Sequence, residues 1–265
     1  MTNVTILSLA SFLLAFITMG YAIFGGGLNA KTLMDFHAMV IVVGGTLAAS
    51  AIAFNPVHIL KMLNAFYRGM LVGREINYAN IVAELMRLAN IQRNSENGLR
   101  QELPQLKDDF MREAITLMLD EVAPPKEVIR ILQERVENIH ERYLADAKKF
   151  KAIGKFPPAM GLMGAVLGMI ALLGSLGSPG AEKTVGPAMS VALVATFWGI
   201  AVANIFIIPI GENLVERAEI IRTKNTIITA GVKLIFEGTN AIVLAEKLNS
   251  YLLPKERLDW KGAGQ

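Results

Sequence analysis

Residues 156–211 read FPPAMGLMGAVLGMIALLGSLGSPGAEKTVGPAMSVALVATFWGIAVANIFIIPIG, and this stretch decides the fold. Its only charged residues are Glu182 and Lys183, which follow a Gly-Ser-Pro-Gly run. The uncharged segments on either side, Phe156–Ala181 and Thr184–Gly211, each exceed the length of about 20 residues that a helix needs to cross a bilayer. A turn-rich break between two such segments predicts a hairpin of two transmembrane helices.

A second uncharged pair of segments lies near the N-terminus. Val4–Asn29 and Phe36–Val57 contain no Asp, Glu, Lys or Arg, and a Gly-rich connection separates them. No basic residue precedes Val4, so we interpret the first segment as a retained helix rather than a secretory signal. With 53% hydrophobic and 18% charged residues, the composition is that of a membrane protein. The predicted fold is all-α, with four transmembrane helices and a helical cytoplasmic domain.

The distribution of basic residues predicts the orientation. Of the 26 Lys and Arg residues, 16 lie within 55–155 and 8 follow residue 211. The positive-inside rule places both regions, and therefore both termini, in the cytoplasm of a bacterium, with the spans in its inner membrane. The predicted domains are a first hairpin (1–57), a cytoplasmic helical domain (58–155), a second hairpin (156–211) and a cytoplasmic tail (212–265).

Cofactor chemistry has no support in the sequence. The chain has no cysteine and only three scattered histidines, namely His37, His58 and His140. No compact cluster of metal-ligating or catalytic residue types lies in or beside the predicted spans, so we expect neither an enzyme nor a bound cofactor. The net charge of +3 is small, and we expect the lipid bilayer and other proteins as partners rather than nucleic acid.

The charged middle segment reads as helices. A long helix is predicted from Pro125 to about Lys149, continuing nearly to the third span, and another from Glu212 to about Glu237. Apolar residues recur near the 3.6-residue period, as in Ile81, Leu85, Leu88 and Ile91, and in Val128, Ile131, Leu132, Val136 and Ile139.

None of the four spans contains an ionisable Asp, Glu, Lys or Arg. A proton route through hydrocarbon normally needs such a side chain near mid-membrane. If this chain conducts protons, a partner helix must supply the carboxylate.

Five short motifs together resemble one family, the MotA/PomA flagellar stator subunits, over nearly the whole chain. The motifs are IVVGGT (41–46), PAMGLMG (158–164), VALVAT (191–196), IPI (208–210) and LPKER (253–257). The resemblance implies a homopentamer around two MotB-like subunits, which supply a membrane aspartate. It also implies that ion flow drives torque on a FliG-like rotor switch protein.

Two positions carry the expected ion pathway. In the family, the threonine that matches Thr196 faces the partner's carboxylate; the alternative for such a mid-helix hydroxyl is a bond to its own backbone four residues back. Sodium-driven members have a threonine where this chain has Ala165. A dehydrated Na⁺ needs several oxygen ligands, so we predict protons as the coupling ion, with Na⁺ less favoured.

Five further residues match functional positions of the family. Pro158 and Pro209 match prolines that link ion binding to movement of the cytoplasmic domain. Arg93 matches an arginine that faces the rotor, and Arg100 and Glu102 lie in the same region, where Glu102 replaces an acidic residue expected one position earlier. The alternative for these charges is a solvated face.

Other readings remain open from the sequence. An ExbB/TolQ-like energiser shares the ring-forming architecture, although that family usually has three spans. A MotA-like subunit of a non-flagellar ion-driven machine is a further alternative. The small residues of the third span, including the Gly164-to-Gly168 spacing, suit packing against another helix of the same chain or against a rotating partner.

Overall fold

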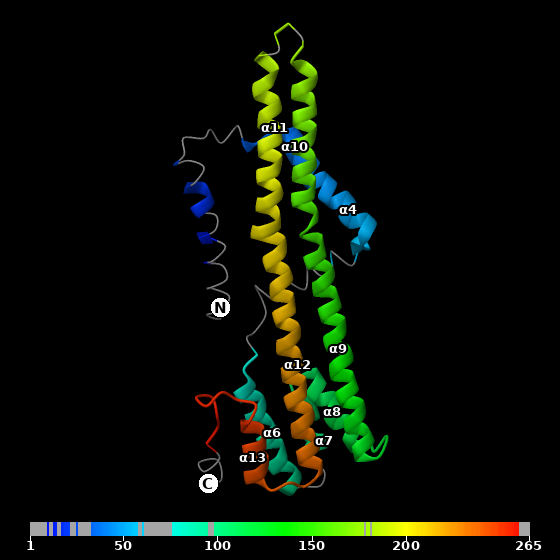
Figure 1. The fold of residues 1–265 in the computed structure, drawn as a ribbon. Helices are drawn as coiled ribbons and strands as arrows, with labels where there is room; N and C mark the ends of the chain where they lie inside the picture. The colour runs from blue at the N-terminus through cyan, green and yellow to red at the C-terminus, as the bar shows by residue number, and fades with distance from the viewer. Residues whose placement is uncertain are drawn as a thin grey trace. The chain divides into compact units, whose positions relative to one another are not determined.

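The chain forms helices only, throughout the part that the structure describes (Figure 1). The computed structural model describes residues 33–57, 76–94, 98–177, 179–180 and 182–259, together with residues 10, 13–14, 17–21, 25 and 60. Contacts divide the chain into two compact units. The membrane unit comprises Met1–Glu75 and Leu144–Val215, and the polar unit comprises Ile76–Tyr143 and Glu216–Gln265.

Three described helices are long and apolar enough to cross a membrane. The first runs over Phe36–Ala53, and the other two lie within Pro125–Ser175 and Glu182–Phe236. They confirm the second, third and fourth predicted spans. The predicted first span, Val4–Asn29, lies largely outside the described residues, so the count of four spans stays a prediction.

The second span is one helix with a widened turn. It consists of α3 (Phe36–Met39), the π-helix η1 (Val40–Gly44) and α4 (Gly45–Ala53). The side chain of Asp35 caps its start by accepting a hydrogen bond from the Ala38 amide at 3.1 Å. The helix ends earlier than the sequence predicts because Phe54 is extended, directly before the Asn-Pro dipeptide that disfavours helix.

The helices α10 (Phe156–Ser175) and α11 (Glu182–Ala201) pack side by side as a hairpin (Figure 1). Their contact is a seam of glycine and alanine. A β-carbon on Gly161 would lie 2.7 Å from the Ala195 carbonyl oxygen, and one on Gly168 would lie 2.7 Å from that of Ala188. Because only glycine fits such an approach, the small face of the third span serves packing within the chain.

A second π-helix, η4 (Val202–Ile207), joins α11 to α12 (Ile208–Phe236). Pro209 is the second residue of α12. Proline lacks an N–H group, and its ring clashes with the carbonyl four residues earlier. A widened turn directly before it relieves that clash. The helix therefore runs from the fourth span into the tail without a break, whereas the sequence suggested two separate helices.

The polar unit buries large apolar side chains. It contains α6 (Tyr78–Asn94), α7 (Gly98–Glu102), the 3-10 turn η3 (Leu103–Gln105), α8 (Asp109–Leu119), most of α9 (Pro125–Ile153), most of α12, and α13 (Ala241–Asn249). Its core includes Leu85, Leu88, Ile115, Leu132 and Ile227, all fully buried. The predicted long helix from Pro125 is confirmed, and only Gly154 and Lys155 separate α9 from α10.

Candidate functional site

Thr196 lies in the middle of α11, on the seam with α10. Its hydroxyl donates to the carbonyl of Ala192, four residues back, at 3.0 Å. The carbonyl oxygen of Gly161 on α10 lies 3.5 Å from the same hydroxyl. The backbone bond considered from the sequence is therefore present. It uses only the hydroxyl's proton, so the oxygen lone pairs remain able to accept a hydrogen bond.

Ala165 and Thr196 flank the same point of the seam. A β-carbon on Gly164, the residue before Ala165, would lie 2.6 Å from the β-carbon of Ala195, the residue before Thr196. Both Ala165 and Thr196 are half-buried. The two predicted pathway residues thus lie at one level of the hairpin, where the hydroxyl of Thr196 offers an oxygen and the methyl of Ala165 offers none.

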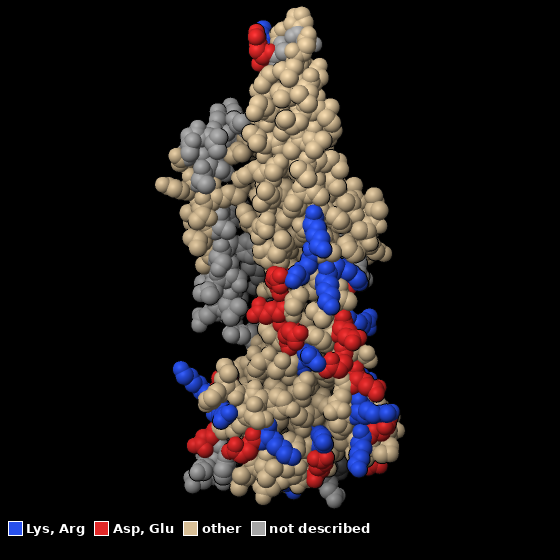
Figure 2. Space-filling view, in the orientation of Figure 1, with Lys and Arg blue, Asp and Glu red and all other residues tan. Residues whose placement is uncertain are grey.

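Ionisable side chains avoid the membrane helices. Phe36–Ala53 and α10 contain no Asp, Glu, Lys or Arg, and α11 carries only Glu182 and Lys183 at its loop end. Figure 2 shows the visible face of the α10–α11 hairpin free of charged residues except at that end. A side chain that titrates at mid-membrane is therefore missing from the described spans.

The two predicted coupling prolines lie at the same end of the α10–α11 pair. Pro158 is in the first turn of α10, and a β-carbon on Gly199 would lie 2.6 Å from the carbonyl oxygen of its neighbour Pro157. Pro209 follows Ile208, whose side chain would lie 3.0 Å from a β-carbon on Gly154. The sequence analysis missed Gly199, although its small size opposite the glycines of α10 was a usable signal.

The three predicted rotor-facing charges differ in their partners. Arg100 donates to Asp120 at 3.0 Å and to the carbonyl of Leu119 at 3.3 Å. Arg93 donates to the backbone carbonyl of Thr239 and, among the described residues, is in no salt bridge.

Glu102 accepts a hydrogen bond from Arg87 at 2.8 Å. Arg87 also donates to Glu84, and hydrogen bonding to Glu84 and then Glu102 raises the pKa of Arg87. Of the three predicted residues, only Arg93 has a charge that no carboxylate of the described chain compensates.

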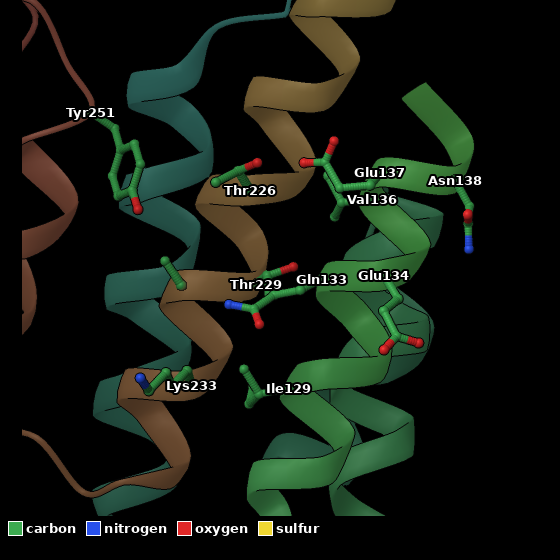
Figure 3. A pocket seen from close by; sticks show the side chains of 11 residues that line it. Ile129, Gln133, Glu134, Val136, Glu137, Asn138, Thr226, Thr229, Lys233 and Tyr251 are labelled. Atoms are coloured by element: carbon green, nitrogen blue, oxygen red, sulfur yellow. The ribbon is translucent and has the colours of Figure 1, made fainter. Parts of the chain in front are cut away.

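A polar groove of about 770 Å³ lies between α9 and α12 in the polar unit. Figure 3 shows Gln133 and Thr229 pointing toward each other across it. The carboxylate of Glu137 at its edge is paired with Arg222 at 3.0 Å. Since Thr229 also donates to its own helix backbone, we assign this groove no role in proton transfer.

Comparison with known proteins identifies the family. The model of the MotA/TolQ/ExbB proton channel family matches residues 102–226. Motility protein A of Borreliella burgdorferi is 30% identical over 84% of this chain and 84% of its own length. Motility protein A of Bacillus subtilis is 26% identical over 97% of this chain and 94% of its own length.

A solved structure agrees. The structure of the flagellar MotAB stator complex from Bacillus subtilis contains a chain that is 26% identical and superposes with a TM-score of 0.82, covering 96% of this chain and 98% of that one. The predicted resemblance is confirmed: the chain belongs to the MotA/TolQ/ExbB proton channel family and is a relative of motility protein A.

Proposed function

We propose that this chain is the ring-forming subunit of a flagellar stator, which couples proton entry to torque on the rotor. The observation that carries the proposal is the lack of an ionisable side chain in the described membrane helices. Because proton transfer through hydrocarbon needs such a group, a MotB-like partner supplies the carboxylate. The family relationship supports an arrangement of five copies around two partner helices.

Thr196 and Ala165 define the route beside that carboxylate. The hydroxyl oxygen of Thr196 accepts a hydrogen bond from a water molecule or from the protonated partner. One hydroxyl with a methyl beside it makes a poor cage for dehydrated Na⁺. Protons are therefore the coupling ion.

Movement begins where Pro158 and Pro209 lie. Both prolines are at the end of the α10–α11 pair from which α9 and α12 extend, and each of these long helices has residues in both compact units. A change in the partner's charge shifts the packing at this end, and the helices carry the shift to the polar unit. That unit lies in the cytoplasm and faces a FliG-like rotor protein through Arg93.

The test is complementation in a stator-deficient, flagellated strain that expresses the chain with its MotB-like partner. Swimming is expected to return, to stop with a protonophore, and to fail when the partner's membrane aspartate is replaced by asparagine. Native mass spectrometry of the detergent-solubilised complex is expected to count five copies of this chain and two of the partner. A stable dimer or tetramer in the presence of the partner contradicts the stoichiometry, and recovery of an outer-membrane uptake process in place of swimming favours an ExbB/TolQ-like role.

A further inference from the structure

A second pocket of about 770 Å³ opens in the polar unit beside the predicted rotor-facing residues. Its walls come from the ends of α6, α7, α8 and α12 and from the turn between α8 and α9. It is lined by Gln92, Arg100, Met118, Leu119, Glu121, Val122, Ala123, Pro124, Pro125 and Phe236. Most of this lining is apolar, and a volume of this size is typical of pockets that bury a bound group.

The turn that forms one wall is rigid. The carbonyl oxygen of Pro124 accepts hydrogen bonds from the amides of Glu127, at 2.8 Å, and Val128, at 3.1 Å. Glu121 occupies the left-handed region with φ of 48°, which residues other than glycine rarely adopt. Two prolines and two backbone bonds fix this wall before any partner arrives, which lowers the entropic cost of binding.

Arg100 supports the pocket rather than presenting a free charge. Its guanidinium bonds the carbonyl of Leu119 and the carboxylate of Asp120, so it ties α7 to the end of α8. The charge of Glu102 is likewise compensated by Arg87. Two of the three predicted rotor-facing charges are therefore engaged within the chain, and charge attraction alone leaves the rotor contact with Arg93.

An apolar mouth lies next to that remaining charge. Val122, at the rim, is 67% exposed, a large fraction for a β-branched apolar side chain. Arg93 donates to Thr239, which closely follows the pocket residue Phe236, so the cation and the pocket share the end of α12. An apolar pocket with an uncompensated arginine beside it fits an amphipathic helix that presents a bulky apolar residue near a carboxylate.

We propose that this pocket receives an apolar side chain from a helix of the FliG-like rotor protein, while a carboxylate of the same helix pairs with Arg93. The proposal rests on the proposed stator function and adds an apolar anchor to the rotor contact. Burial of the anchor holds the helix in place during each step. The arginine steers the encounter and sets its register.

Cysteine crosslinking tests the contact in the intact motor, since the chain has no cysteine of its own. Val122→Cys is expected to crosslink to rotor protein that carries single cysteines along its exposed charged helix. Val243→Cys is the matched control, because Val243 is an exposed valine of the same unit, 46% exposed and absent from the pocket lining. A crosslink at Val122 to another copy of this chain, or equal yields at both valines, overturns the proposal.

Substitution separates the anchor from the charge. Val122→Glu is expected to weaken rotor binding by roughly tenfold, the scale of losing one anchor residue, whereas Val243→Glu and Val122→Leu leave it unchanged. Added salt is expected to weaken binding of the wild-type chain less than removal of the anchor does, because salt screens only the Arg93 pair. Full binding and swimming in Val122→Glu would refute the pocket while leaving the stator function intact; failure of the wild-type chain to restore swimming would refute the function itself.

Discussion

The membrane unit and the polar unit hold their helices together by opposite means. In the membrane unit, glycines and alanines such as Gly161, Gly164 and Ala195 let backbones approach closely. In the polar unit, Leu85, Leu132 and other large side chains fill the space between helices. Lipid is as apolar as leucine, so helices in a membrane gain stability from close contact rather than from removing apolar surface from water. In water that removal is the main stabilising term.

The largest expected effect comes from truncating a core side chain of the polar unit. Leu132→Ala removes a fully buried side chain and is expected to cost about 2–5 kcal/mol. The matched change in the membrane unit is Leu162→Ala, since Leu162 is 63% exposed on the single chain and its truncation is expected to cost well under about 1 kcal/mol. Thermal unfolding of the purified complex compares them. A larger loss for Leu162→Ala would show instead that this residue is buried against another chain of the assembly.

Adding one methyl group sharpens the comparison in the opposite direction. Gly161→Ala places a β-carbon 2.7 Å from a backbone carbonyl oxygen of α11, which cannot move without separating the helices, and is expected to cost about 1–3 kcal/mol. Gly231→Ala in α12 meets the flexible end of Leu85 instead. Alanine is the better helix former by about 1 kcal/mol, so that change is expected to be nearly neutral. Equal shifts of the unfolding temperature in the two variants would contradict the seam.

The two units also differ in how far the sequence predicts them. Span positions follow from long uncharged segments, and α9 follows from its apolar period after Pro125, so these elements are readable locally. The π-helices are not, because Val202–Ile207 has the same composition as an ordinary apolar helix.

The pairing of the rotor-facing charges is also not readable. Arg100 meets Asp120 and Glu102 meets Arg87 only after α6, α7 and α8 have packed. Those partners change which charge is free for a rotor, and the pocket beside Arg93 comes from five separate segments. Thr196 was predicted from the resemblance, yet its place on the seam required the structure.

Two threonines with the same local geometry distinguish a pathway role from a structural one. Thr196 in the membrane unit and Thr229 in the polar unit each donate to a carbonyl four residues back, at 3.0 Å and 2.9 Å. Thr196→Ala is expected to slow swimming with assembly unchanged, and a barrier higher by about 1.4 kcal/mol already slows a step tenfold. Thr229→Ala loses the same kind of bond and is expected to leave swimming speed unchanged, while Thr196→Ser restores it. If both alanine variants swim alike, Thr196 has only the structural role.

The smallest expected effect is at Ala165, and it tests the coupling ion. Ala165→Ser adds an oxygen beside Gly164, at the level of Thr196, without entering the buried seam, because Ala165 itself is half-buried. A proton needs only a hydrogen-bonded relay, so one more hydroxyl is expected to leave swimming speed and its sensitivity to a protonophore as they are. A dehydrated Na⁺ needs several oxygens at once, so a single added hydroxyl is also too little to create sodium coupling. Swimming speed of both the wild type and Ala165→Ser should therefore be independent of external sodium at constant proton-motive force. If the wild-type speed instead follows external sodium, the missing oxygens come from the partner helix and the proton assignment is wrong.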